Sequence, residues 1–190
     1  MKTVVSVAIA LATFTAASAA FALGPGFTAG KASAGARLQY GIDMEDYEAN
    51  PYGLGFGLRG GYTLDMNVYI GGNFEYFFGG SETVGGAEFS WNVWQLQVEG
   101  GYDLGFGPKF VVRPQLGLGL GAFTGEFCYE DSVGRACEDP SETDFSLTPG
   151  ALALYDVGAV FLAGEVRFNA IMAEETATAL FIGVGAGMTF

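Results

Sequence analysis

Apolar and more polar positions alternate one by one along this chain, from about Ala34 to its last residue. In the first alternating segment, Leu38 and Tyr40 fall on one face, and Arg37 and Gln39 fall on the other. A period of two predicts β-strands, because successive side chains of a strand point to opposite faces. Eight segments carry the pattern: 36–44, 53–64, 67–78, 91–102, 110–121, 145–155, 160–169 and 180–190. The sequence therefore predicts an all-β fold.

The connections between these segments alternate in length. The tight ones are Leu64–Asn67, Asp103–Pro108 and Asp156–Ala159, and the mostly longer ones are 45–52, 79–90, 124–144 and 172–178. Short turns at one end and longer loops at the other are typical of outer-membrane barrels. We therefore predict an eight-stranded antiparallel up-and-down transmembrane β-barrel. An even number of strands places both termini with the tight turns, on the periplasmic side.

The composition of the two strand faces decides which face points into the barrel. The less apolar face is mostly glycine with a few arginine, glutamate, glutamine and asparagine residues. A sheet facing solvent seldom has so many glycines and so few charges, whereas glycine in a narrow lumen leaves room for long polar side chains. We expect the apolar face to meet lipid. The sixth segment is apolar on both faces, and there we expect Leu147, Ala151 and Tyr155 to point outward.

The polar face carries equal numbers of positive and negative charges. An unpaired charge inside a low-dielectric lumen is costly, so we expect these groups to form structural ion pairs. The predicted lumen charge network consists of Arg37, Arg59, Arg113 and Arg167 together with Asp43, Glu75, Glu99 and Glu165.

Aromatic residues gather at one level of the outward face. They lie at strand ends that the connections place on the periplasmic side, and they are Tyr62, Tyr102, Phe110, Tyr155 and Phe190. Girdles of aromatic residues mark the membrane interface in transmembrane barrels. We therefore place this level at the membrane interface.

The first residues have the features of an export signal. Lys2 precedes an apolar run over 4–14, and small-residue motifs follow at 17–19 and 20–22. A positive start, a short apolar core and a small-residue cleavage site define a secretory signal peptide. We predict a cleaved signal peptide over 1–22, a short periplasmic segment over 23–33 and the barrel over 34–190.

The residue types limit the chemistry that this chain can perform. It has no histidine, and acid–base or nucleophilic sites commonly depend on one. Glycine-rich runs such as 116–121 alternate within a strand instead of opening a helix, so they are not phosphate-binding loops. The formal net charge of −13 argues against a nucleic-acid partner. We expect no enzymatic activity, no catalytic residues, no cofactor and no metal site.

Most acidic residues fall in the predicted outer loops. Loop 124–144 is the longest and contains Cys128 and Cys137, which can form a local disulfide in an oxidising compartment. One interpretation is a solvated, repulsive surface that maintains solubility. The other is that loop 124–144 binds an extracellular partner, or that the acidic loops capture a divalent cation.

Residues 34–190 resemble the small outer-membrane β-barrel superfamily that includes the OmpA transmembrane domain, OmpX and the opacity-type proteins. The most specific shared element is the last strand, which ends in Phe190 with Met188 and Val184 in register before it. The resemblance implies that these three residues belong to the signal recognised by the barrel-assembly machinery. It also implies residence in the outer membrane of a Gram-negative bacterium, in contact with its lipid.

The expected role is structural or a surface interaction. The alternatives are a narrow ion or solute channel and, less favoured, a soluble lipocalin-like carrier, which would need an apolar lumen and a polar exterior.

Overall fold

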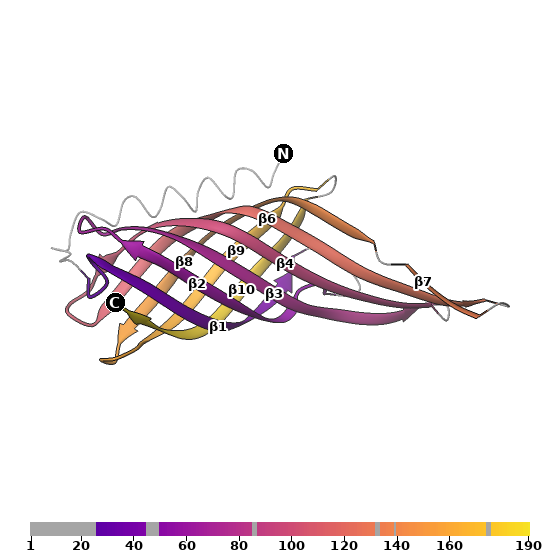
Figure 1. Cartoon of the computed structure of the whole chain (residues 1–190), viewed down its shortest axis with the longest axis horizontal. Helices are drawn as coiled ribbons and strands as arrows, with labels where there is room; N and C mark the ends of the chain where they lie inside the picture. The colour runs from indigo at the N-terminus through magenta and orange to yellow at the C-terminus, as the bar shows by residue number, and fades with distance from the viewer. Residues whose placement is uncertain (1–25, 45–49, 85–86, 132–133, 139, 174–175) are drawn as a thin grey trace.

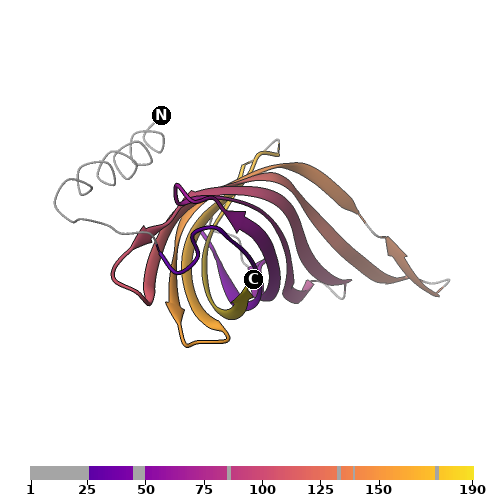
Figure 2. The same cartoon turned by 60° about the vertical axis from the view of Figure 1, so that its left-hand side comes forward.

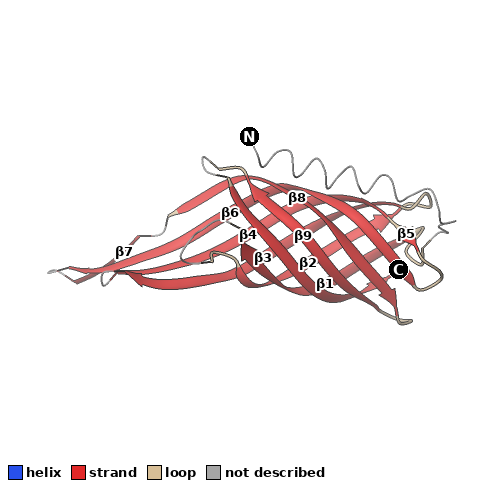
Figure 3. Ribbon diagram, turned by 180° about the vertical axis from the view of Figure 1, so that it is seen from behind, coloured by secondary structure: helices blue, strands red, loops and turns tan. Residues whose placement is uncertain are grey.

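The computed structural model describes residues 26–44, 50–84, 87–131, 134–138, 140–173 and 176–190, which lie almost entirely in strands (Figure 3). These strands are β1 (Lys31–Asp43), β2 (Gly53–Thr63), β3 (Val68–Val84), β4 (Ala87–Tyr102), β5 (Leu104–Gly105), β6 (Phe110–Asp131), β7 (Gly134–Glu138), β8 (Ser141–Asp156), β9 (Phe161–Ile171) and β10 (Ala177–Thr189). In the described ranges, no helix is long and apolar enough to cross a membrane. The predicted signal peptide over 1–22 lies outside them.

Eight of these strands form a closed antiparallel barrel, to which β5 and β7 are short additions (Figure 2). β1 pairs with β10, with Leu38 opposite Val184. β4 pairs with β6, with Leu96 opposite Leu120. Together with the pairs between the remaining neighbours, these pairings close the sheet into a cylinder, which confirms the predicted fold class.

The apolar face of the strands points away from the lumen. Leu38 and Val184 are 62% and 68% exposed, whereas Arg37, next to Leu38, is 7% exposed. An outward apolar band and a polar interior suit a barrel surrounded by hydrocarbon. This arrangement is the reverse of a soluble lipocalin-like carrier, so that alternative is wrong.

Strand β8 has the phase expected for the sixth segment. Tyr155 is exposed on its outer face, and Leu152 and Leu154 are buried inside the barrel. The segment is apolar on both faces because these two leucines belong to an apolar cluster within the lumen.

The expected aromatic residues lie on the outside of the barrel at one end. Their exposed fractions are 46% for Tyr62, 47% for Tyr102, 37% for Phe110, 48% for Tyr155 and 70% for Phe190. Phe110 pairs with Tyr155, while Tyr62 and Phe190 both lie opposite Ala32. We call this end, with its tight turns, the turn end. The C-terminus lies there, at the left in Figure 1.

The prediction of loops over 79–90 and 124–144 is wrong, because both segments are largely strand. β3 and β4 remain paired as far as Val84 and Ala87, and β6 continues to Asp131 and pairs with β7. Beyond the barrel these strands form a sheet that projects from the end opposite the turn end (Figure 1). We call residues 79–84, 87–90, 124–131 and 134–138 the projecting sheet. The alternating sequence pattern did not predict the projecting sheet, because a sheet with no face in contact with lipid does not need apolar residues at every second position.

Strand β1 begins at Lys31, inside the segment 23–33 that was expected to precede the barrel. Residues 26–30 form turns immediately before it. The described part of this segment therefore belongs to the folded barrel.

Candidate functional site: the lumen and the projecting sheet

Three arginines and three glutamates form a continuous ion-pair cluster in the middle of the lumen. Their side chains come from five strands: Arg37 from β1, Arg59 from β2, Glu75 from β3, Glu99 from β4, and Glu165 and Arg167 from β9. The Arg59 Nε and Nη2 atoms lie 2.7 and 3.0 Å from the two oxygens of Glu99. Glu165 lies 2.8 Å from the Arg37 Nε, 3.1 Å from the Arg59 Nη2 and 3.2 Å from the Arg167 Nη2.

Glu75 completes this cluster by accepting hydrogen bonds from both Arg37 and Arg167. Its side chain is fully buried. Two guanidinium groups around one buried carboxylate offset the cost of removing these charges from water. The cluster therefore links β1, β3 and β9 across the lumen.

Glycines supply the space for these side chains. A Cβ atom on Gly57 would lie 2.8 Å from the Arg37 guanidinium carbon, and one on Gly117 would lie 2.7 Å from the Gln97 Oε1. Real Cβ atoms do not approach other atoms so closely. The ends of the Arg37 and Gln97 side chains therefore fill the space that these two inward-facing glycines leave, and a larger residue at either position would displace them.

Arg113 forms a separate group near the turn end, and its partner is Asp103. The Arg113 Nε lies 2.5 Å from the Asp103 Oδ1, and its Nη2 donates to the Asp103 Oδ2 at 2.8 Å. The guanidinium also stacks 3.7 Å from the ring centre of Tyr69. Sequence reasoning missed Asp103 because it lies at the start of a tight connection instead of within the alternating pattern. Its proximity to Arg113 in the adjacent strand was the available signal.

Asp43 lies farther along β1 than Arg37, in register with Ala179 near the projecting end. None of the ion pairs described above for the cluster around Glu75 and Glu165 includes Asp43. A role for Asp43 in the lumen charge network stays a prediction.

An apolar cluster lies on each side of the central charges. Toward the turn end it consists of Val111, Leu152, Leu154 and Phe161, with Phe27 and Ala163 packed against it. Toward the projecting end it consists of Tyr52, Phe77, Val93, Ile171, Ala179 and Phe181, with Phe123 and Ala177 packed against it. The interior of the barrel is therefore layered, with apolar contacts on both sides of the charges.

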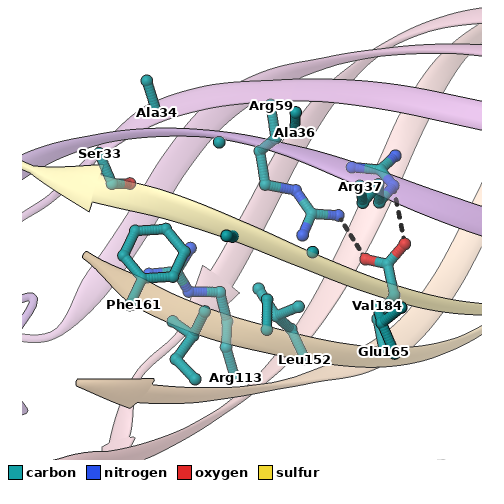
Figure 4. Close-up of a pocket in the computed structure, with 15 residues that line it drawn as sticks. Ser33, Ala34, Ala36, Arg37, Arg59, Arg113, Leu152, Phe161, Glu165 and Val184 are labelled. Carbon is teal, nitrogen blue, oxygen red and sulfur yellow. Dashed lines mark hydrogen bonds and ion pairs between the residues drawn. The ribbon is translucent and has the colours of Figure 1, made fainter. Parts of the chain in front are cut away.

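A small cavity of about 30 Å³ lies between the central charges and the turn-end cluster (Figure 4). Arg59, Arg37 and Glu165 lie on one side of it, and Leu152 and Phe161 lie on another. Its size suits about one or two water molecules.

The projecting sheet contains both cysteines. Cys128 on β6 pairs in register with Cys137 on β7, and their sulfur atoms form a disulfide. The carboxylate of Glu126 lies near these sulfurs, but the metal ligand that cysteine offers is its thiolate, and sulfurs joined in a disulfide are not thiolates. Glu126, Glu138 and Glu142 are exposed around the base and edge of this sheet.

The residues of the expected assembly signal lie on the outer face of the barrel. Val184, Met188 and Phe190 are 68%, 47% and 70% exposed. Phe190 exchanges backbone hydrogen bonds with Ala32, beside the pairing of β1 with β10. A recognition signal at these positions stays a prediction.

Comparison with known proteins finds one family model and several solved structures. The model of the outer membrane protein beta-barrel domain matches residues 6–190. Among curated protein sequences, none matches the chain.

The structural matches are whole barrels of low sequence identity. The attachment invasion locus protein Ail of Yersinia pestis is 15% identical, with a TM-score of 0.56 over 84% of this chain and 97% of that chain. Neisserial surface protein A is 14% identical, with a TM-score of 0.57 over 84% of this chain and 96% of that chain. A major outer membrane protein from Thermus thermophilus is 13% identical, with a TM-score of 0.61 over 84% of this chain and 99% of that chain. At such identities the likeness concerns the fold.

Proposed function

Because this chain belongs to the outer-membrane β-barrel family, we propose that it is a surface-interaction protein in which the barrel anchors the projecting sheet at the cell surface. As a member of that family, it is a protein of the outer membrane. The observation that carries the proposal is the contrast between the filled barrel and the projecting sheet. Buried ion pairs and two apolar clusters fill the barrel, whereas the projecting sheet extends beyond it.

The proposal orients the barrel with its projecting sheet outside the cell and its turn end in the periplasm. Short periplasmic turns and longer extracellular segments are typical of outer-membrane barrels. The outward aromatic level, including Tyr62 and Tyr155, then lies at the periplasmic interface with the lipid. In this orientation Phe190 lies at the periplasmic end of the last strand, where we expect the assembly machinery to recognise it.

We propose a basic partner for the projecting end, namely an exposed lysine-rich or arginine-rich segment of another protein. The segment 124–144 contains seven acidic residues and one basic residue, Arg135. The exposed carboxylates described above, among them Glu126 and Glu142, attract positive charge and speed the encounter of a basic partner. Ail has been solved in complex with the heparin analogue sucrose octasulfate. Since that ligand is polyanionic, we expect the acidic surface of this chain to repel it.

Binding of model peptides tests the proposal. The folded barrel is titrated with a fluorescent oligolysine peptide and, in separate titrations, with a fluorescent oligoglutamate peptide and with sucrose octasulfate as anionic probes. The test variant is the pair Glu126→Gln and Glu142→Gln, which keeps the side-chain shape. The matched control is the pair Asp65→Asn and Asp156→Asn, which removes the same charge at the turn end.

We expect the test variant to weaken oligolysine binding by about three- to tenfold, since exposed ion pairs contribute about 0.2–1 kcal/mol each. The control should bind like the unaltered chain, and added salt should weaken every complex. Equal weakening by both variants, or binding of the anionic probes to the barrel as tight as that of oligolysine, would reject the projecting end as a basic-partner site.

The described lumen gives less support to the channel alternative. A conducting path would have to pass the ring of Phe181, the ion pairs around Glu75 and the side chain of Leu154, all of which are buried. Eight strands leave an interior just wide enough for side chains to fill. We also propose no enzymatic role for the buried carboxylates of Glu75, Glu99 and Glu165, because arginine side chains pair with all three.

A further inference from the structure

We propose that residues 26–30, which we call the N-terminal cork, close the turn-end mouth of the barrel and are held there by a latch between Thr28 and Asp103. The cork lies directly before β1, but its side chains contact walls formed by other strands. The proposal concerns how the lumen is sealed, so it is independent of the partner of the projecting sheet.

Phe27 supplies the apolar part of the cork. Its ring packs against the turn-end cluster, and its centre lies 6.3 Å from the centre of the Phe161 ring. Ala163, which lines the cavity, packs against the same cluster. A phenylalanine over this cluster shields the buried leucine side chains from water.

Thr28 supplies the polar part. Its hydroxyl donates to the Asp103 Oδ2 at 2.5 Å, and the residue is 1% exposed. The Thr63 hydroxyl lies 3.2 Å from the same oxygen, and Arg113 pairs with both oxygens of this carboxylate. Four segments therefore meet at Asp103: the cork, the end of β2, the connection after β4, and β6.

The backbone of the cork is shaped to this mouth at both of its ends. A Cβ atom on Gly26 would collide with the Val111 side chain, so a larger residue does not fit there without movement. Gly30 has a φ of +70°, a left-handed conformation that favours glycine, and its N–H donates to the carbonyl of Thr63 at 2.9 Å. Two glycines at these positions allow the chain to turn under the barrel and then enter β1.

The position of the cork has a consequence for the order of assembly. β1 forms the seam of the barrel by pairing with β10, whereas Asp103 and Val111 belong to the segment from β4 to β6 on another part of the wall. The cork can therefore reach its place only when both parts of the wall are present. Its docking then holds the start of β1 in place after the barrel has closed.

Chemical labelling inside the lumen tests this role. Both native cysteines are bridged, so Ala163→Cys introduces a single free thiol behind Phe27. The refolded full barrel in detergent micelles is treated with a small, charged methanethiosulfonate reagent. The rate of modification is compared between Ala163→Cys alone and the same protein carrying Phe27→Ala or Thr28→Val.

We expect Phe27→Ala to speed labelling by about tenfold or more and Thr28→Val by a smaller factor, because each shifts the cork toward its undocked state. Phe106→Ala is the matched control, since Phe106 is an exposed phenylalanine at the same end that contacts Phe110 instead of the cluster. Gly26→Val is a second way to displace the cork without altering a cluster residue, and it should also speed labelling. Gel mobility without heating establishes that each variant is folded.

Labelling at the same rate in the Phe27→Ala, Gly26→Val and Phe106→Ala proteins would overturn the proposal. So would rapid labelling of Ala163→Cys with the cork intact, because the mouth would then be open to solvent.

Discussion

The ion pair between Arg59 and Glu99 offers a quantitative test of the lumen charges. It joins β2 to β4 across the intervening β3, and the two side chains are 12% and 1% exposed. Arg59→Met keeps most of the side-chain volume but leaves Glu99 without the guanidinium that occupies both of its oxygens. Removing one partner of a buried pair costs about 3–5 kcal/mol, because the remaining charge stays desolvated.

The assay is urea unfolding of the barrel in lipid vesicles, followed through the fluorescence of Trp91 and Trp94. For an m-value of about 2 kcal/mol/M, the loss corresponds to a fall of about 2 M in the unfolding midpoint. Glu99→Gln removes the opposite charge. The double variant, Arg59→Met with Glu99→Gln, removes both, so we expect it to be less destabilised than the sum of the single variants by about 2 kcal/mol or more.

Lys109→Met is the matched control, since it removes an exposed cation at the turn end. We expect it to change the free energy of unfolding by no more than about 0.5 kcal/mol. If Arg59→Met behaves like Lys109→Met, or if the two lumen variants are simply additive, these charges do not stabilise the barrel as a buried pair.

Three further predictions concern the outer face, the last strand and the disulfide. Val184→Arg should destabilise the barrel in lipid by about 2–4 kcal/mol, as measured by urea unfolding, because it places a charge on the lipid-facing side of β10; unchanged stability would mean that Val184 does not meet hydrocarbon. Deletion of Phe190 should reduce the folded, faster-migrating form in outer-membrane fractions, and normal amounts would remove its role in assembly. Mass spectrometry without reductant should find Cys128 linked to Cys137, and Cys128→Ser should increase proteolysis within 126–144 while insertion continues; two free thiols in protein from the outer membrane would contradict this.

The strands of the barrel wall are predictable from sequence because lipid and lumen impose opposite demands on successive residues. Leu38 meets hydrocarbon while Arg37 meets Glu75, and this contrast recurs around the wall. The position of each charge along its strand also follows from this alternation. Which carboxylate pairs with which arginine does not follow, because it depends on the stagger between strands. Glu165 contacts three arginines, an arrangement that equal numbers of charges do not predict.

The projecting sheet and the interior apolar clusters escape the same reasoning for different physical reasons. Beyond the membrane the lipid no longer selects apolar residues on one face, so acidic stretches such as 126–131 can be strands without alternating. Inside the barrel, Leu152 and Phe161 occupy inward positions where the pattern elsewhere has polar groups or glycine. They are recognisable only once the register places them beside Val111 and Phe27.

The layered lumen also explains how charges can be retained inside a small barrel. The largest apolar surfaces of this barrel face lipid, so it has no single large hydrophobic core. The hydrogen-bond ladders between its strands and the contacts inside its lumen hold the fold together. Ion pairs from Arg37, Arg59 and Arg167 connect strands that are not neighbours in the wall, but such pairs weaken when water reaches them. The apolar clusters on both sides restrict that access. The cluster residues and the charges therefore act together, and a variant that opens the turn-end cluster should reduce the coupling between Arg59 and Glu99 even though it touches neither residue.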